Sequence, residues 1–242
     1  MADENAPRAP NVALLIDADN ASPDSLDPVL TVLAELGTVN IRRAYGNWQK
    51  AGLKGWANMV HRHAIEPQQQ FDVTKGKSAT DMKMTIDAMD LLYRGHVHGF
   101  GIMSSDSDFM PLAMRIRQDG LPVYGFGTAK TPDSFRQACS RFIDVGALGV
   151  GEVGEAPDSA GSAELKPAVD AAVVKLLGDA IKASKRDERG FASIQEVGRR
   201  AGNRSSFDAR NYGYSRLSEL LEAIPNFQIE RGDGGAMVRR VR

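Results

Sequence analysis

The sequence predicts an α/β protein, with a parallel sheet flanked by helices and then a small second domain of helices and a hairpin. Two observations carry this prediction. Up to residue 145, short apolar runs alternate with amphipathic stretches, which is the pattern of a parallel sheet. The segment 146–167 is rich in Gly, Ala, Ser, Pro and Glu without a sustained period, as is typical of a flexible linker. With 242 residues the chain is long enough for two domains, which we place at 11–145 and 168–242.

The apolar runs of the first region predict five strands. They lie at 12–16, 39–45, 64–71, 100–103 and 122–126. Apolar residues between these runs recur at helical spacing. This spacing predicts helices near 25–36, 50–62, 80–93, 108–119 and 132–140. In the third helix we expect the buried face to consist of Met82, Ile86, Met89 and Leu92.

The second region shows a different pattern. Apolar residues at helical spacing, such as Val173, Leu177 and Ile181, predict a helix over 168–184. Further helices are expected near 193–202 and 214–223. The two short apolar runs that follow flank a glycine-rich turn, which is a hairpin signal. Three helices and a hairpin fit a winged-helix-like module.

Composition excludes several classes of protein. Cys139 is the only cysteine, so neither a disulfide framework nor a cysteine-based zinc site is available. No stretch of eighteen or more apolar residues occurs, and residues 1–10 are polar, without the apolar core of a signal peptide. We therefore expect a cytoplasmic protein that has no membrane partner.

Charge is distributed unevenly along the chain. From Lys166 to Arg242 there are 15 Lys and Arg against 10 Asp and Glu, a net charge of +5, and the rest of the chain holds 15 against 21, a net charge of −6. An acidic region suits metal binding, and a basic region suits a phosphate backbone. The alternative is a chance asymmetry between two solvated surfaces.

Carboxylates follow two of the predicted strands at the point where each strand ends. Asp17 and Asp19 follow the first strand, and Asp106 and Asp108 follow the fourth. Residues two apart in an extended segment point the same way, and ligands of parallel sheets collect at the carboxyl ends of the strands. Both pairs are therefore expected to face one pocket.

A further carboxylate, Asp81, lies near the start of the third predicted helix. Clustered carboxylates repel one another in a partly desolvated cleft, and Mg²⁺ or Mn²⁺ is the usual ion that neutralises them. Taken singly, each aspartate fits a helix cap or a favourable helix-dipole position equally well. Asp87 and Asp90 are rotated away from Asp81, so we expect them at the surface or in support of the site.

Several motifs in order resemble the NYN domain of the bacterial LabA-like group, relatives of PIN nucleases. They are Leu15–Asn20, Arg43–Gly46, Gly76–Asp81, Asp87–Asp90, Ser104–Leu112 and Val123–Gly127. The resemblance covers residues 11–145 and implies a Rossmann-like (PIN-like) sheet with a metal-dependent ribonuclease site. It implies these catalytic, metal-binding acids: Asp17, Asp81, Asp106 and Asp108. Asp19 and Asn20 would support them. Ser105, beside Asp106, is suited by its hydroxyl to orienting a ligand and is a further supporting candidate. Many relatives carry an acid where this chain has Asn47, which puts a role for that loop in doubt.

The second region resembles the OST-HTH/LOTUS domain, a small winged-helix fold. Phe191–Ser193 and Ser206–Leu221 carry this resemblance, which covers residues 168–242. It implies binding of RNA or of a protein partner. Arginines and tyrosines supply charge and stacking surfaces for RNA, and lysines just before Asp81 suit a phosphate. The RNA-binding candidates are Lys75, Lys77, Arg210, Tyr212, Tyr214 and Arg216. Helix core for the tyrosines and solvated surface for the charged residues are the alternatives.

Two other functions fit parts of the sequence. A haloacid-dehalogenase-type phosphatase also begins with a strand that ends in Asp-x-Asp, but residue 21 is Ala where that family prefers Thr or Ser. A catalytically weak or inactive RNA or protein adaptor is the non-enzyme alternative. The sequence leaves formation of a homodimer open.

Overall fold

The computed structural model describes residues 9–71, 79–148, 169–232 and 235–241. Contacts divide the chain into two compact units, Met1–Gly146 and Ala147–Arg242, and each is described by itself. The first unit contains a six-stranded sheet and the second a three-stranded sheet. The predicted linker, 146–167, lies outside the described residues from residue 149 onwards.

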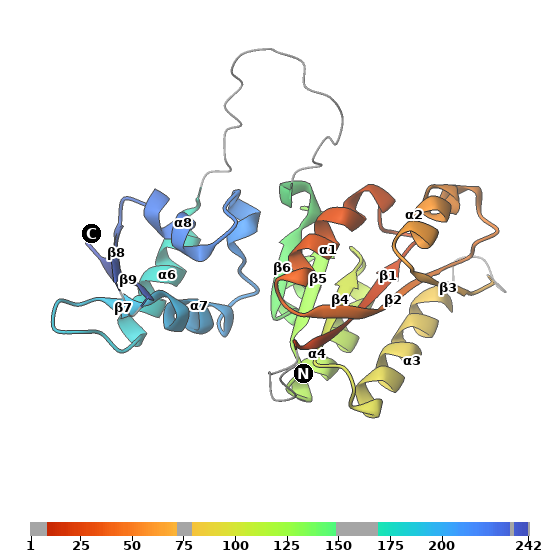
Figure 1. Ribbon diagram of the computed structural model, residues 1–242, viewed down its shortest axis with the longest axis horizontal. Helices are drawn as coiled ribbons and strands as arrows, with labels where there is room; N and C mark the ends of the chain where they lie inside the picture. Colours follow the sequence, from red (N-terminus) through yellow and green to blue (C-terminus); the bar gives the residue numbers. More distant parts are fainter. Residues whose placement is uncertain (1–8, 72–78, 149–168, 233–234, 242) are drawn as a thin grey trace, which may run out of the picture. The chain divides into compact units, whose positions relative to one another are not determined.

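The sheet of the first unit is parallel throughout, with the strand order β3-β2-β1-β4-β5-β6 (Figure 1). Its strands are β1 (Asn11–Asp17), β2 (Thr38–Gly46), β3 (Glu66–Gln69), β4 (Gly99–Met103), β5 (Val123–Gly127) and β6 (Arg141–Asp144). The order reverses between β1 and β4, and ligands of such sheets bind at the carboxyl ends of the strands beside this reversal. The parallel α/β fold predicted from the sequence is confirmed.

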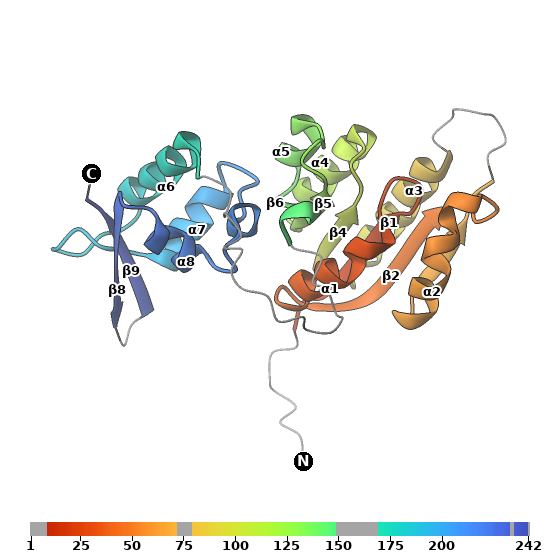
Figure 2. The same ribbon diagram turned by 90° about the horizontal axis from the view of Figure 1, so that it is seen from above.

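Helices cover both faces of this sheet. They are α1 (Leu26–Ala34), α2 (Trp56–Arg62), α3 (Ala79–Arg94), α4 (Met110–Gln118) and α5 (Asp133–Ala138), with the 3-10 turns η1 (Pro23–Ser25), η2 (Ala51–Gly55), η3 (Ser107–Phe109) and η4 (Val145–Leu148). Figure 2 shows the sheet between α1 and α2 on one side and α3, α4 and α5 on the other. Every residue of β1 after Asn11 is buried, because a central parallel strand is covered on both faces.

The structure corrects the predicted buried face of α3. Met82 and Ile86 were expected in the core, but their exposed fractions are 67% and 52%. The side chains that α3 buries include Met84, Ala88 and Leu91, which pack against the sheet. Leu92 is buried and Met89 packs against the core as predicted, so the spacing gave the buried face correctly only in the second half of α3.

Two further differences concern short elements. β6 was not predicted, because only Phe142 and Ile143 in it form an apolar run. The helix expected at 50–62 instead begins as the 3-10 turn η2 and becomes α-helical at Trp56. Short runs carry too few residues for a period to be recognised.

The second unit packs three helices against a small antiparallel sheet. Its elements are α6 (Ala171–Ala183), β7 (Ala192–Ser193), α7 (Ile194–Gly202), η5 (Ala209–Tyr212), α8 (Leu217–Ala223), β8 (Phe227–Gly232) and β9 (Gly235–Arg240), and the strand order is β7-β9-β8. Leu177, Val197, Leu220 and Val238 lie in one core with no exposed surface. The predicted helices and hairpin are present. Among the described residues, no helix is long and apolar enough to cross a membrane.

Candidate metal centre

Three of the predicted acids meet at the carboxyl edge of the sheet. Asp81 lies in the first turn of α3, and Asp106 and Asp108 follow β4. One carboxylate oxygen of each lies within 4.8 Å of the others. Asp106 also caps η3, because its Oδ1 accepts a hydrogen bond of 2.9 Å from the backbone N–H of Asp108. These oxygen ligands are of the type that Mg²⁺ and Mn²⁺ prefer.

Asp17 is not one of these three but lies next to them at the end of β1. Its side chain is fully buried. Oδ2 accepts hydrogen bonds from Ser104 Oγ at 2.7 Å and from Asn20 Nδ2 at 2.9 Å. Oδ1 has no hydrogen-bond partner in the described parts of the chain. Burial raises the pKa of Asp17, although the hydrogen bonds from Ser104 and Asn20 lower it.

Ser104 connects Asp17 to the three acids. Its hydroxyl donates to Asp17 Oδ2 and accepts a hydrogen bond of 3.1 Å from the backbone N–H of Asp106. Ser105, the serine chosen from the sequence, accepts instead from Thr131 Oγ1 at 2.9 Å and from Thr128 N at 3.1 Å. Residues two apart in an extended segment share a direction. That alternation groups Ser104 with Asp106 and could have identified it.

Asp19 contacts a lysine and a threonine from two different elements. Its Oδ1 forms an ion pair of 3.1 Å with Lys50 Nζ, and its Oδ2 accepts a hydrogen bond of 3.3 Å from Thr80 Oγ1. Thr80 directly precedes Asp81 in α3. Asp19 therefore joins the loop after β2 to the start of α3. Lys50 and Thr80 were not identified from the sequence, where they belong to different predicted elements.

Asp87 is buried and is not a surface residue, with a residue exposure of 7%. It accepts hydrogen bonds from Lys83 Nζ at 2.7 Å and from the Tyr45 hydroxyl at 3.2 Å, and Arg43 lies 3.6 Å away. Burial, and then the charge of Asp87, raise the pKa of Tyr45 far above its ordinary value. Asp87 thus ties α3 to β2, whereas Asp90 is exposed as expected.

Asn47, where many proteins of the resembled group carry an acid, follows β2. Its Oδ1 accepts hydrogen bonds from Gln69 Nε2 at 3.1 Å and from Gln49 N at 3.3 Å. The residue therefore joins the loop after β2 to the end of β3. Lys75 and Lys77, predicted to meet a phosphate, lie outside the described residues.

The RNA-binding candidates of the second unit differ in their surroundings. Arg210 Nη1 lies 3.1 Å from both carboxylate oxygens of the buried Asp208. Tyr212 stacks on Phe207 with ring centroids 6.0 Å apart, and Tyr214 packs against the core. Arg216 is the exposed member of the set, at the start of α8. Arg210 and the two tyrosines thus help to hold this segment on its core.

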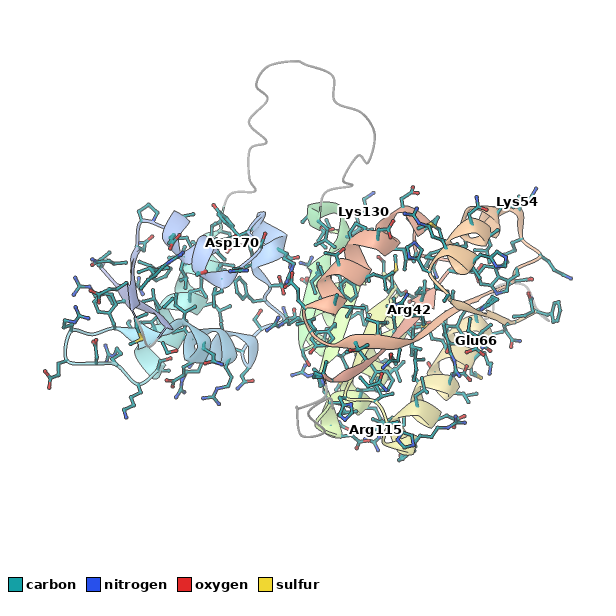
Figure 3. The ribbon with its side chains drawn as sticks, viewed as in Figure 1. Arg42, Lys54, Glu66, Arg115, Lys130 and Asp170 are labelled. Atoms are coloured by element: carbon teal, nitrogen blue, oxygen red, sulfur yellow. The ribbon has the colours of Figure 1, made fainter. Side chains whose placement is uncertain are left out.

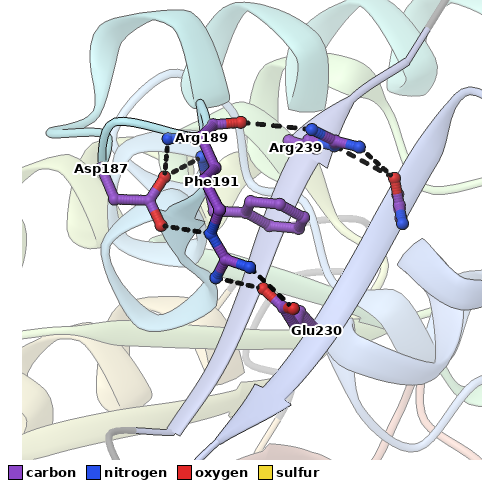
Figure 4. A network of polar contacts seen from close by, with 6 residues as sticks. Asp187, Arg189, Phe191, Glu230 and Arg239 are labelled. Carbon is purple, nitrogen blue, oxygen red and sulfur yellow. Dashed lines mark hydrogen bonds and ion pairs between the residues drawn. The ribbon is translucent and has the colours of Figure 1, made fainter.

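Two other arginines, Arg189 in the turn before β7 and Arg239 in β9, lie close to the ring of Phe191 (Figure 4). Arg189 Cζ lies 5.3 Å and Arg239 Cζ 4.7 Å from the ring centroid. Arg189 pairs with Glu230, and Arg239 donates to Gln228 Oε1 at 2.8 Å and 3.0 Å. These arginines contribute cation–π contacts that brace the sheet.

Two family models match the chain. The NYN domain model matches residues 11–148, and the OST-HTH/LOTUS domain model matches residues 164–239. An uncharacterized protein of Methanocaldococcus jannaschii is 30% identical over 128 residues, which are 49% of this chain and 50% of that protein. The chain therefore spans about half the length of this curated relative.

Two solved structures align with parts of the chain. A protein of unknown function from Vibrio parahaemolyticus is 16% identical, with a TM-score of 0.47 over 58% of this chain and 95% of that chain. An uncharacterized protein from Nitrosomonas europaea is 24% identical, with a TM-score of 0.29 over 38% of this chain and 91% of that chain. Neither likeness bears on function.

Proposed function

Because the chain belongs to the NYN domain family and carries a C-terminal OST-HTH/LOTUS domain, we propose that it is a metal-dependent ribonuclease. RNA phosphodiester bonds are hydrolysed at the aspartate cluster, and the C-terminal module binds RNA or a protein partner. The observation that carries this proposal is the meeting of Asp81, Asp106 and Asp108 within 4.8 Å at the carboxyl edge of the sheet. Asp81 comes from α3, and Asp106 and Asp108 follow β4, so the fold, and not proximity in the sequence, brings Asp81 to the other two acids.

The donor set fits a hard divalent ion. Opposite ligands of Mg²⁺ lie about 4.2 Å apart, twice the usual bond length of about 2.1 Å. Oxygens already within 4.8 Å of one another need only small side-chain rotations to meet this requirement. When bound, such an ion supplies charge neutralisation and an activated water for attack on a phosphodiester.

The chain's own residues prepare the site for this chemistry. Ser104 and Asn20 occupy Oδ2 of Asp17, so its Oδ1 is the oxygen left to face a cation. The backbone N–H of Asp108 fixes Oδ1 of Asp106. These contacts hold the acids in place before substrate binds, which reduces the reorganisation required during the reaction.

The decisive experiment is cleavage of a labelled single-stranded RNA with Mg²⁺ or Mn²⁺, with and without EDTA. We expect metal-dependent cleavage that the double variant Asp106→Asn/Asp108→Asn loses by on the order of a hundredfold or more. Asp90→Asn is the matched control, because Asp90 is an exposed carboxylate on α3. Equal cleavage by the double variant and the control would contradict the proposal.

An RNA or protein adaptor is the second candidate. The net charge of +5 over residues 166–242, together with the exposed Arg204 and Arg216, favours a binding role for the second unit. RNA that is bound but never cleaved, by the wild type and the acid variant alike, would select this function. The phosphatase alternative is disfavoured, because residue 21 is Ala where that family prefers Thr or Ser.

A further inference from the structure

The loop after β2, residues 47–50, borders the acid cluster. Lys50 Nζ is 3.1 Å from Asp19 Oδ1, and Asp19 Oδ2 is 3.3 Å from the hydroxyl of Thr80, the residue before Asp81. A single carboxylate therefore separates this loop from the first turn of α3. A substrate lying over the three acids would reach the loop next.

Trp48 is held in a fixed position in this loop. Its backbone N–H donates to Gln69 Oε1 at 3.0 Å, and its indole Nε1–H donates to the carbonyl oxygen of Gln68 at 3.1 Å. The polar atom of the ring is thus satisfied, and the side chain is only half-buried. Trp56, by contrast, has an exposed fraction of 1%. A fixed aromatic ring at a site's edge loses little conformational freedom when a ligand stacks on it.

Lysines lie along the same edge of the sheet. Lys54 in η2 and Lys130 after β5 are exposed. Figure 3 shows both at one edge of this unit, with Arg115 of α4 at the opposite edge. The sheet order places the ends of β2, β1, β4 and β5 in a row. Neighbouring strands lie about 4.8 Å apart, so the three gaps between these four strands span roughly 14 Å. A row of this length suits several linked nucleotides better than one.

From this arrangement we infer that the loop after β2 binds single-stranded RNA at the acid site. Trp48 stacks on an unpaired base, and the exposed Lys54 contacts a flanking phosphate. Bases in a duplex are stacked on one another, so only a strand with exposed bases can use this ring. The inference rests on the proposed function and adds to it the substrate class and a positioning residue, Trp48.

The chain contains two tryptophans, so replacing one of them leaves fluorescence that reports on the other alone. In the variant Trp56→Phe, Trp48 is the only tryptophan. With EDTA present to prevent cleavage, a fluorescein-labelled single-stranded RNA should quench its emission in a saturable titration, while anisotropy of the label reports total binding. The matched variant Trp48→Phe keeps only the buried Trp56 and should show no quenching. A duplex of the same sequence should not quench either variant.

Binding strengths provide a second readout. Trp48→Ala should weaken single-strand binding by about 5- to 150-fold, the range that base–aromatic stacking gives. Trp48→Phe retains an aromatic ring and should restore most of the affinity. Lys54→Gln should reduce the slope of log affinity against log salt by about 0.7, the value for one phosphate contact on a single strand.

The outcomes separate this inference from the nuclease proposal. Quenching of Trp48 without any cleavage would support the inference while contradicting the nuclease proposal. The opposite outcome is metal-dependent cleavage together with binding, seen as a rise in label anisotropy, that leaves the fluorescence of Trp48 unquenched. This outcome would overturn the inference and leave the nuclease proposal standing.

Discussion

Asp17 is a buried acid with one carboxylate oxygen that has no hydrogen-bond partner within the described residues. A charge in this environment is unfavourable until an opposite charge compensates it. We therefore expect Asp17→Asn to abolish metal-dependent cleavage and yet to raise the thermal midpoint at pH 7 in EDTA.

Differential scanning calorimetry of the metal-free proteins would test this expectation. Asp106→Asn is the comparison, because Asp106 is less buried and its carboxylate accepts a backbone N–H. If Asp17→Asn lowered the midpoint more than Asp106→Asn, the charge of Asp17 would not be the unfavourable element of this site.

Cys139 allows a prediction about pH. Burial raises the pKa of its thiol from 9.0 to about 12, so the folded protein holds this proton more tightly than the unfolded chain. The resulting stabilisation is complete below about pH 9 and is lost as the pH rises from 9 towards 12. The free energy of unfolding should therefore fall across this range.

Urea unfolding at pH 7, 9 and 10.5 measures the effect. Lysines and tyrosines also titrate in this range, so the contribution of the thiol is the difference between wild type and Cys139→Ala. The wild type should lose more stability than the variant between pH 9 and 10.5. Parallel pH profiles would contradict the assignment of the effect to Cys139.

At the scale of elements, α3 links the fold to the site, because the helix that presents Asp81 is anchored on the sheet by its buried side chains and by Asp87. Met84 has no exposed surface, whereas Ile86 on the opposite face is 52% exposed. Met84→Ala should cost about 2–5 kcal/mol of stability. Ile86→Ala should change it by less than about 0.5 kcal/mol.

Chemical denaturation of the two variants provides the comparison, since both substitutions remove apolar side chains from the same helix. A large loss for Ile86→Ala with a small one for Met84→Ala would mean that Ile86 is buried, as first predicted from the sequence. Equal small losses would mean that α3 contributes little to folding.

At the scale of the whole molecule, each of the two units has its own hydrophobic core. Units with separate cores generally fold separately. The fragments 1–148 and 169–242 should therefore each unfold cooperatively, with midpoints close to two transitions of the intact chain. Failure of either fragment to show a cooperative transition by circular dichroism would contradict this prediction.

Much of this architecture follows from the sequence alone. The apolar runs that end at Asp17 and before Asp106 predicted strands β1 and β4, and the parallel pattern predicted that their carboxyl ends would meet. The positions of the helices and of the hairpin in the second unit were predicted in the same way. These features depend on local periodicity, on turn chemistry and on the residue type at strand ends. Each of these is determined by residues that are neighbours in the sequence.

Only the tertiary structure decided which side chains meet across the fold. It placed Asp81 beside Asp106 and Asp108, and it made Ser104 the link to Asp17. It also placed Asp87 and Arg210 in ion pairs and chose the buried face of α3. The physical reason is that hydrogen bonding, burial and ion pairing depend on packing between elements distant in the sequence, and no local pattern specifies the rotation of one element against another.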